Sequence, residues 1–302
     1  MLPTRVEIAP MLPTRVEIAP SVWMPRLNLN AYPNSSAWLG MGGRGMDSAL
    51  DYGDDRQREM GSAARSSGIP RSALFITSKV PCCPKPSGFV MSGGIWPFLP
   101  APRCQHASRN TTADIEFDLK TIGVPYVDLM LLHFTCDRWE DTLSAWRALE
   151  DAAISGQARA IGVSNFNRTD IEKLVSSPNV RLPPAVNQAG FAIGSPQNAT
   201  LGRDWATIKR CRELGVKYEA YAPFGERHGD APTSRVDVLS DPTVTRIAQR
   251  HNRSTAQVAL RWIFQHDLLV ITGSANPSHL QGDLGAFDFE LSAADMAELD
   301  AV

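Results

Sequence analysis

The sequence predicts an α/β fold in which eight parallel strands, each followed by a helix, close into a (β/α)8 TIM barrel. Short apolar or β-branched runs that end in a polar residue recur eight times between residues 26 and 274. Segments with the apolar period of a helix lie between most of these runs. The alternation extends over roughly 275 residues, which is the usual size of such a barrel.

The strands expected in chain order are residues 26–30, 44–49, 74–79, 127–133, 158–165, 185–188, 216–221 and 268–274. Helices are expected at 139–156, 169–177, 204–215 and 254–267, and several of these begin at a capping residue or end at a glycine. Functional residues of a barrel lie at the C-terminal ends of its strands. The polar residue that closes each run is therefore a candidate for chemistry.

Two segments interrupt this pattern. AYPNSSAWLGMGGRG (31–45) carries Pro33 and four glycines, which predicts that the first crossover helix is truncated. PCCPKPSGFVMSGGIWPFLPAPRCQ (81–105) holds six prolines and three glycines, which predicts a long irregular insertion between the third and fourth strands. GMGGRG (40–45) matches G-x-G-x-x-G, but no strong strand precedes it and no helix follows it, so we interpret it as a glycine-rich turn.

The N-terminus contains a short duplication, because MLPTRVEIAP occurs at residues 1–10 and again at 11–20. Two copies of ten residues are too few for a repeat architecture. We expect residues 1–20 to be a flexible segment and residues 21–302 to form the barrel domain.

Composition narrows the class of partner. Thirty basic and thirty-two acidic side chains give a net charge of -2, without the basic surplus typical of nucleic-acid binding, so we expect a small-molecule partner. No apolar run approaches the roughly 18 residues of a membrane span, and no secretory signal is recognisable, so we expect a cytoplasmic protein. Nothing in the sequence implies an oligomer.

The five cysteines, at positions 82, 83, 104, 136 and 211, include no CxxC pair. Their odd number favours reduced thiols over a disulfide framework or a zinc site. We expect no metal.

Four polar residues close successive strand candidates. Asp47 and Tyr52 lie in MDSALDYG (46–53), Lys79 closes the third strand and His133 the fourth. Each has an ordinary structural explanation when taken alone, as a solvated carboxylate, a packing phenol, a snorkelling lysine or a buried histidine. In a barrel, however, all four converge on one mouth.

With these residues in place, the chain resembles the aldo-keto reductase family from about residue 22 to 302. The matching segments are MPRLNL (24–29), DSALDYG (47–53), GIPRSALFITSKV (68–80), VDLMLLH (127–133), GVSNF (162–166), AVNQ (185–188), YAPFG (221–225) and FDFELS (287–292). The resemblance implies reduction of an aldehyde or ketone to an alcohol by NAD(P)H. Tyr52 is then the general acid, Lys79 brings its proton release closer to the working pH, Asp47 pairs with Lys79, and His133 donates to the substrate carbonyl.

The resemblance also implies a cofactor site. Ser164, Asn165 and Gln188 match residues that hold the nicotinamide carboxamide, Tyr221 matches the ring that stacks on it, and Gly225, Ser274 and His279 complete the site. A turn at Ser164 and Asn165, or a backbone cap at Gln188, is the alternative. Gly273 and His279 replace the lysine and arginine that clamp the 2'-phosphate in the family. We therefore expect NADP(H) with a weakened preference, and NAD(H) as the alternative.

A second hypothesis competes with the enzyme. The chain could be a non-catalytic barrel that binds a nicotinamide nucleotide for regulation, or a damaged gene product with an impaired fold. The reasons for the second version are the truncated first helix and the proline-rich insertion at 81–105, because a parallel barrel that lacks an outer helix exposes an apolar strand face.

Overall fold

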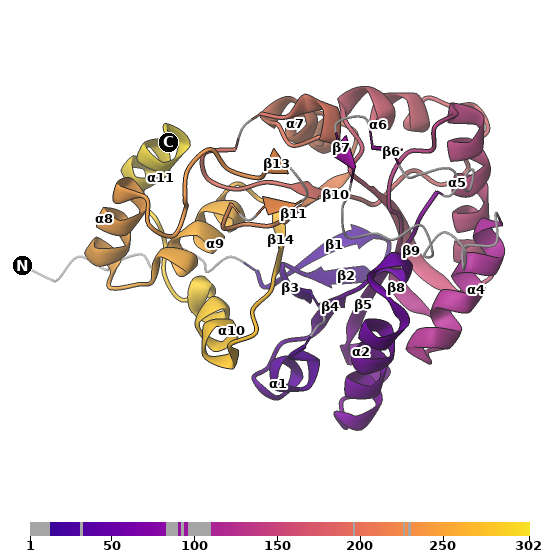
Figure 1. Cartoon of the computed structure of the whole chain (residues 1–302), viewed down its shortest axis with the longest axis horizontal. Coiled ribbons are helices and arrows are strands. Elements are labelled where there is room, and N and C mark those ends of the chain that lie inside the picture. The colour runs from indigo at the N-terminus through magenta and orange to yellow at the C-terminus, as the bar shows by residue number, and fades with distance from the viewer. Residues whose placement is uncertain are drawn as a thin grey trace, which may run out of the picture.

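A closed ring of eight parallel strands forms the centre of the molecule, and helices surround it (Figure 1). The computed structural model describes residues 13–30, 33–82, 90–91, 94–95, 110–195, 197–225, 227–228 and 231–302. Around the barrel the strands follow the order β3, β4, β5, β8, β9, β10, β11 and β14, and β14 pairs with β3 to close the ring. The predicted (β/α)8 TIM barrel is confirmed.

All eight strand predictions are confirmed, with ends shifted by one or two residues. The strands are β3 (Leu27–Asn30), β4 (Gly45–Asp47), β5 (Phe75–Val80), β8 (Val127–Leu132), β9 (Ala158–Ser164), β10 (Val186–Gly190), β11 (Lys217–Tyr221) and β14 (Leu269–Thr272). Every residue of β5 and β8 is buried. Strands covered on both faces cannot alternate between apolar and polar residues, which explains their nearly continuous apolar runs.

The outer layer consists of helices, some of which pack on the strands and others on neighbouring helices. They are α1 (Ser35–Gly40), α2 (Asp54–Ser66), α4 (Thr111–Ile122), α5 (Trp139–Ile154), α6 (Arg168–Val175), α7 (Trp205–Glu213), α8 (Pro242–His251), α9 (Thr255–Gln265), α10 (Pro277–Leu284) and α11 (Ala293–Asp300). The four predicted helices correspond to α5, α6, α7 and α9. Capping boxes at Asn167, Ser254 and Ser292 fix the starts of α6, α9 and α11.

The first crossover helix, α1, is as short as predicted, with six residues. Trp38 and Leu39 are nevertheless buried, and they belong to the same apolar cluster as the buried strand residues Leu27, Leu29 and Met46. The indole N–H of Trp38 donates to the carbonyl of Gly45 at 2.9 Å. GMGGRG forms the turn from α1 to β4. The uncovered strand face, which was our reason for suspecting an impaired fold, is therefore not found.

A β-hairpin closes one end of the barrel. Strands β1 (Arg15–Ala19) and β2 (Val22–Pro25) pair antiparallel, and in Figure 1 they lie at the centre of the ring. Ile18, Val22 and Met24 are buried in a cluster with Phe75, Leu129, Leu131 and Leu269. The flexibility that we expected of residues 1–20 is thus wrong for residues 13–20, because they form β1 and place Ile18 in this cluster. Residues 1–12 lie outside the described residues.

The predicted insertion at 81–105 falls mostly outside the described residues. Within it the structure describes Pro81, Cys82 and the two-residue strands β6 (Val90–Met91) and β7 (Gly94–Ile95), which pair antiparallel. A similar pair, β12 (Arg227–His228) and β13 (Ala231–Pro232), follows β11.

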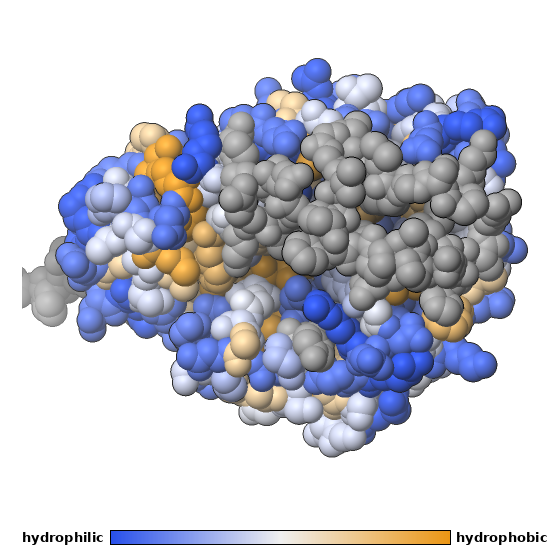
Figure 2. All heavy atoms as spheres, viewed as in Figure 1, coloured by the Kyte–Doolittle hydropathy of each residue, from blue (hydrophilic) through white to orange (hydrophobic). Residues whose placement is uncertain are grey.

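Polar residues dominate much of the visible rim in Figure 2, with an apolar strip toward the α8 side. Large apolar side chains that are exposed in the described part of the chain, Trp23, Ile154 and Leu239, occur singly. No helix in that part is long and apolar enough to cross a membrane. Nor do three or more histidine, cysteine, aspartate or glutamate side chains there come together as a metal site.

Candidate active site

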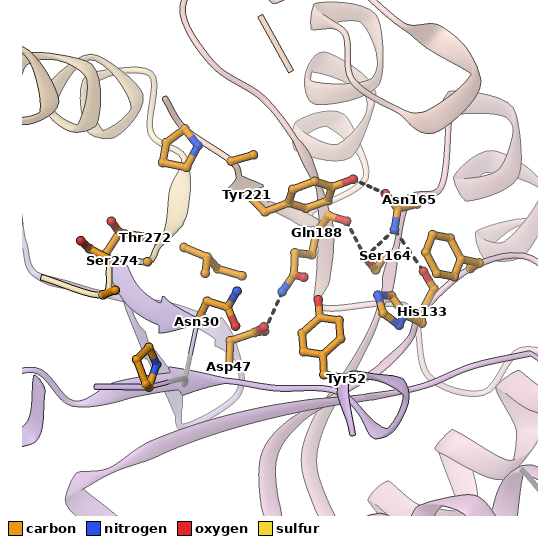
Figure 3. A pocket seen from close by; sticks show the side chains of 17 residues that line it. Asn30, Asp47, Tyr52, His133, Ser164, Asn165, Gln188, Tyr221, Thr272 and Ser274 are labelled. Carbon is orange, nitrogen blue, oxygen red and sulfur yellow. Dashed lines mark hydrogen bonds between the residues drawn. The ribbon is translucent and has the colours of Figure 1, made fainter. Parts of the chain in front are cut away.

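The ends of strands β4, β5 and β8 bring together the four side chains singled out from the sequence. Figure 3 shows three of them, Asp47, Tyr52 and His133, at the cavity. Lys79 Nζ donates to Asp47 Oδ1 at 2.5 Å, to the carbonyl of Ser48 at 2.9 Å and to the phenolic oxygen of Tyr52 at 3.4 Å. These three bonds use all the protons of the ammonium group. The ring centroid of His133 lies 5.7 Å from that of Tyr52.

The local chain path explains why Asp47 and Tyr52 flank one lysine. Asp47 is the last residue of β4, and the following 3-10 turn, η1 (Leu50–Tyr52), folds the chain back over the strand end. Lys79 is buried in β5, and His133 follows directly after β8. Because neighbouring parallel strands end at the same rim, their last side chains meet there.

Burial dominates the proton affinity of Tyr52. Desolvation raises the pKa of the phenol to about 12, and the charges of Asp47 and Asp51 add to this effect, while Lys79 lowers it. Lys79 lowers the pKa of Tyr52, as expected, but desolvation outweighs the lysine, so the net shift of the pKa is upward. Tyr52 is consequently protonated at neutral pH. Burial lowers the pKa of Lys79, but Asp47 and Tyr52 outweigh burial and leave it raised.

A cavity of about 340 Å³ opens above this cluster. Its lining includes Asp47, Tyr52, His133, Gln188, Tyr221 and Ser274. Figure 3 shows Tyr52 and His133 on one side of this space and Thr272 and Ser274 on the other. The volume is within the range of small-molecule sites.

Gln188 is held in one orientation by the carboxyl groups of two acidic side chains. Its Nε2 donates to Asp47 Oδ2 and to Glu219 Oε2, both at 2.9 Å. Since both amide protons are used, the Gln188 side chain presents Oε1 as a hydrogen-bond acceptor at the cavity wall. This arrangement suits a ligand that brings an N–H donor, such as a carboxamide.

Ser164 and Asn165 line the same cavity but are bonded within the protein. Ser164 Oγ donates to the carbonyl of Gln188 at 2.8 Å, and Asn165 Nδ2 donates to Ser164 Oγ at 3.0 Å. The phenol of Tyr221 donates to Asn165 Oδ1 at 2.7 Å. Asn165 has a φ of 59°, a left-handed conformation that asparagine tolerates better than most residues. A ligand that binds the Ser164 hydroxyl or the Asn165 amide must therefore do so alongside these internal hydrogen bonds.

Of the remaining predicted cofactor residues, Ser274 lines the cavity, whereas His279 and Gly225 do not. Ser274 lines it, and its Oγ lies 3.2 Å from His279 Nδ1, but His279 itself is exposed on α10 and is not in the lining. Gly225 is also outside the lining. Its φ of 84°, and a Ser234 Cβ only 2.9 Å from where a Gly225 Cβ would lie, show that a turn and close packing require glycine there.

Two buried carboxylates at the site were missed by sequence reasoning. Glu219 sits beneath Gln188, and burial, followed by the charge of Asp47, raises its pKa to about 8. The sequence did contain one signal for Glu219: it lies two positions before Tyr221 in the same strand. Residues i and i+2 of a strand share one face, so Glu219 faces the same side as Tyr221. Asp51 binds His133 Nδ1 at 2.9 Å, and its position directly before Tyr52 was the only hint.

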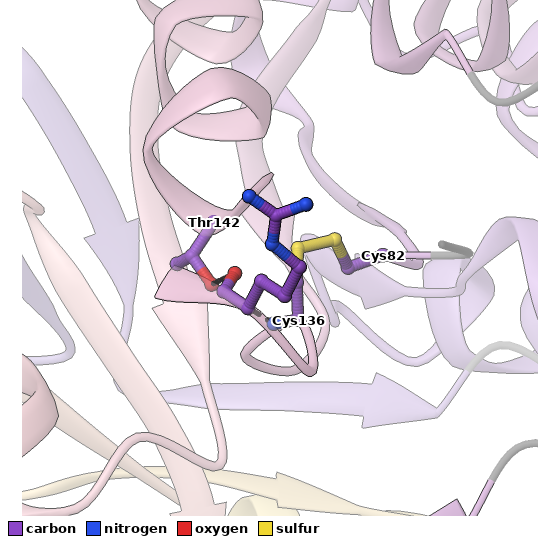
Figure 4. Close-up of a disulfide and its surroundings, with 4 residues drawn as sticks. Cys82, Cys136 and Thr142 are labelled. Carbon is purple, nitrogen blue, oxygen red and sulfur yellow. Dashed lines mark hydrogen bonds between the residues drawn. A yellow bond between two sulfur atoms is a disulfide. The ribbon is translucent and has the colours of Figure 1, made fainter. Parts of the chain in front are cut away.

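A disulfide joins the loops that leave the two neighbouring strands β5 and β8. Cys82 and Cys136 are bonded, with their Cα atoms 5.3 Å apart, and Thr142 Oγ accepts from the backbone N–H of Cys136 at 2.9 Å (Figure 4). The expectation of reduced thiols is wrong for this pair, because only the pairing of β5 with β8 brings together two cysteines 54 positions apart. Cys211 is free and buried, and Cys83 and Cys104 lie outside the described residues.

Comparison with known proteins agrees with this geometry. The family model described as the aldo/keto reductase family matches residues 31–302. The chain is 33% identical to morphine 6-dehydrogenase of Pseudomonas putida over 291 residues, which cover 92% of this chain and 88% of that protein. It is 32% identical to glyoxal reductase of Bacillus subtilis (strain 168), over 86% of this chain and 79% of that one.

Among solved structures, the chain is similar to MGS-M4, an aldo-keto reductase enzyme from a Medee basin deep-sea metagenome library. The two superpose with a TM-score of 0.77 at 28% identity, over 95% of this chain and 94% of the other. The chain therefore belongs to the aldo/keto reductase family and, with it, to the oxidoreductases that act on carbonyl compounds.

Proposed function

We propose that this protein reduces an aldehyde or a ketone to the alcohol with NAD(P)H, and that Tyr52 supplies the proton. The observation that carries the proposal is the contact of Lys79 with both Asp47 and the Tyr52 phenol at the cavity. Lys79 donates to the phenolic oxygen, so the phenolic proton itself is left to be given to a ligand.

The roles of the residues follow from charge. Tyr52 gives its proton to the carbonyl oxygen as negative charge develops there, and a phenol with a pKa of about 12 carries that proton at neutral pH. The phenolate that remains is stabilised by the ammonium of Lys79, which Asp47 holds in place. The bound nicotinamide supplies the hydride.

The residues present fit a nicotinamide. Gln188 Oε1 is the acceptor for its carboxamide N–H, and the ring of Tyr221 offers an apolar face at the cavity. Ser164 and Asn165 are proposed to contact the same carboxamide. With these assignments, the fixed orientation of Gln188, set by its hydrogen bonds to Asp47 and Glu219, serves to present Oε1 to the carboxamide.

Tyr52→Phe separates an enzyme from a binding protein. With an aldehyde panel that includes glyoxal, we expect turnover to fall by about 10²- to 10⁴-fold, because the general acid is lost, while nicotinamide binding stays within a few-fold. The measurements are loss of reduced-nicotinamide absorbance and calorimetric titration of the cofactor. Wild-type binding without turnover of any carbonyl would favour the non-catalytic alternative.

Cofactor preference is predicted to be weak in this chain. Ser274 and His279 lack the fixed positive charge with which lysine and arginine side chains would hold a 2'-phosphate. A Cβ at Gly273 meets only Asn30 Cβ, at 3.5 Å, which is an ordinary van der Waals contact, so the backbone there accepts a residue with a side chain. Gly273→Lys should raise the preference for NADPH over NADH by about 10- to 100-fold, the effect of one charge-assisted hydrogen bond. Ser278→Lys, nearby on α10, is the control for added charge; an equal effect there would contradict a specific clamp.

A further inference from the structure

The catalytic candidate His133 is bound from behind by a carboxylate that the family resemblance did not point to. Asp51 Oδ1 lies 2.9 Å from His133 Nδ1, and both side chains are buried. Asp51 is in the turn η1, next to Tyr52, whereas His133 follows β8, so two separate segments are fixed against each other. Phe134 stacks on the imidazole at a centroid distance of 4.4 Å and limits its rotation.

The charge of Asp51 decides where the imidazole proton lies. Burial by itself raises the pKa of Asp51, but the facing His133 and the charge of Lys79 outweigh burial and leave the pKa below its usual value. Asp51 is therefore a carboxylate at neutral pH, and a carboxylate can only accept hydrogen bonds. The proton in the Asp51–His133 bond must then belong to Nδ1.

This assignment restricts what the other ring nitrogen can do. A neutral imidazole carries one proton, so a ring protonated at Nδ1 has a lone pair at Nε2. That lone pair would repel a carbonyl oxygen in the cavity that His133 lines. Only a ring protonated at both nitrogens can donate to the oxygen.

We propose that Asp51 is a positioning residue that keeps a proton on Nδ1 of His133, so that His133 donates a hydrogen bond to the substrate carbonyl only as an imidazolium. The proposal rests on the proposed function for its substrate, but the proton placement does not. Asp51 and His133 thus form one ion pair at the moment of reaction, and carbonyl reduction weakens as pH rises and the ring loses its second proton.

Other ionisable groups face this pair and set its surroundings. Tyr52 and Lys79 lie on the cavity side, and Asp47 lies beyond Lys79. Asp118 of α4 interacts electrostatically with Asp51. Burial raises the pKa of Asp118 to about 7, so this carboxyl group changes charge near neutral pH. Glu219, with a pKa of about 8, is farther away beneath Asp47. An experiment must therefore observe the His133 ring itself.

The direct test is nitrogen NMR of protein labelled with ¹⁵N-histidine, with the His133 signals assigned through His133→Gln. The wild type should show a protonated Nδ1 at every pH and a protonated Nε2 only on the acid side. In Asp51→Asn, the second proton should be lost at a lower pH than in the wild type, because the carboxylate no longer stabilises the cation. Asp55→Asn, the same change at a side chain that is 99% exposed, should leave the signals unchanged.

The second readout is the pH profile of kcat/KM with an aldehyde. We expect activity to fall on the alkaline side in the wild type, and the fall to occur at lower pH in Asp51→Asn by the same interval as in the NMR titration. Asp118→Asn should not reproduce that shift. A neutral wild-type ring protonated at Nε2, or Asp51→Asn titrating like the wild type, would overturn the proposal. Absence of turnover with the expected NMR result would overturn the proposed function and leave the proton placement intact.

Discussion

Glu219 illustrates how burial sets charge inside this barrel. Its carboxylate accepts from Asn28 Nδ2 at 2.8 Å and from Gln188 Nε2 at 2.9 Å, so both oxygens have a partner. Burial still raises its pKa to about 8, and the neighbouring Asp47 adds to the effect. Glu219 therefore holds its proton over much of the range in which a free glutamate has lost it.

This difference predicts how stability varies with pH. In the unfolded chain Glu219 loses its proton near 4.5, and in the folded chain near 8. Between these values the folded state binds more protons, so the free energy of unfolding falls as pH rises from about 4.5 to about 8. Glu219→Gln should remove this part of the decline, on the order of a few kcal/mol.

Urea unfolding at pH 5 and pH 8 measures the effect of Glu219→Gln. Asp118, with its pKa raised to about 7, contributes in the same direction and should leave a residual slope. Glu290→Gln, at an exposed glutamate, is the matched control and should keep the wild-type slope. A variant at position 219 with an unchanged slope would show that the carboxyl titrates normally in the folded protein.

At the scale of secondary-structure elements, the disulfide constrains the two loops nearest to the chemistry. Cys82 follows Lys79 and Cys136 follows His133, each by three positions, so the bond ties together the chain beyond β5 and β8. The two strands are already paired along their length. The bond therefore acts mainly on the unfolded chain, where it closes a loop between cysteines 54 positions apart.

Loss of this disulfide should lower the free energy of unfolding by up to about 4 kcal/mol, the loop-closure entropy of a chain segment of this length. The measurement is denaturant unfolding of the wild type with and without a reducing agent. Cys136→Ala should be less stable than the oxidised wild type and insensitive to the reductant. If reductant leaves the wild-type midpoint where it was, the bond does not stabilise the protein.

At the scale of the whole molecule, the two ends of the barrel have different tasks. The cavity and its polar residues lie at the C-terminal ends of the strands, while the hairpin β1–β2 covers the other end with Ile18, Val22 and Met24. Chemistry at one end and stability at the other is the division usual for this fold.

Removal of residues 1–20 should therefore destabilise the protein by several kcal/mol. Ile18 is lost from the apolar cluster, and β2, which carries Met24, loses its paired strand β1. Removal of residues 1–10 keeps the second copy of the duplicated segment and the contact of Thr14 with Arg26, and should leave the thermal midpoint unchanged. Thermal unfolding of the two truncations compares them directly. Equal midpoints would contradict a capping role for the hairpin.

The amino-acid sequence by itself determined the barrel, because strand and helix periods are local properties that each segment displays alone. It also determined which residues stand at the strand ends, and so that Asp47 and Tyr52 would meet at Lys79. The shortness of α1 could be predicted from Pro33 and the glycines, but not that Trp38 would be buried in the same apolar cluster as the strand residues.

Only the tertiary structure decided the remaining features, because each depends on pairs of residues that are distant in sequence. The disulfide requires β5 to lie beside β8, and the bond from Asp51 to His133 requires η1 to face the end of β8. The pKa of Tyr52 depends on how much water the surrounding strands exclude, a balance that no short motif contains. Periodicity fixes the elements, whereas burial and charge at the site arise from their packing.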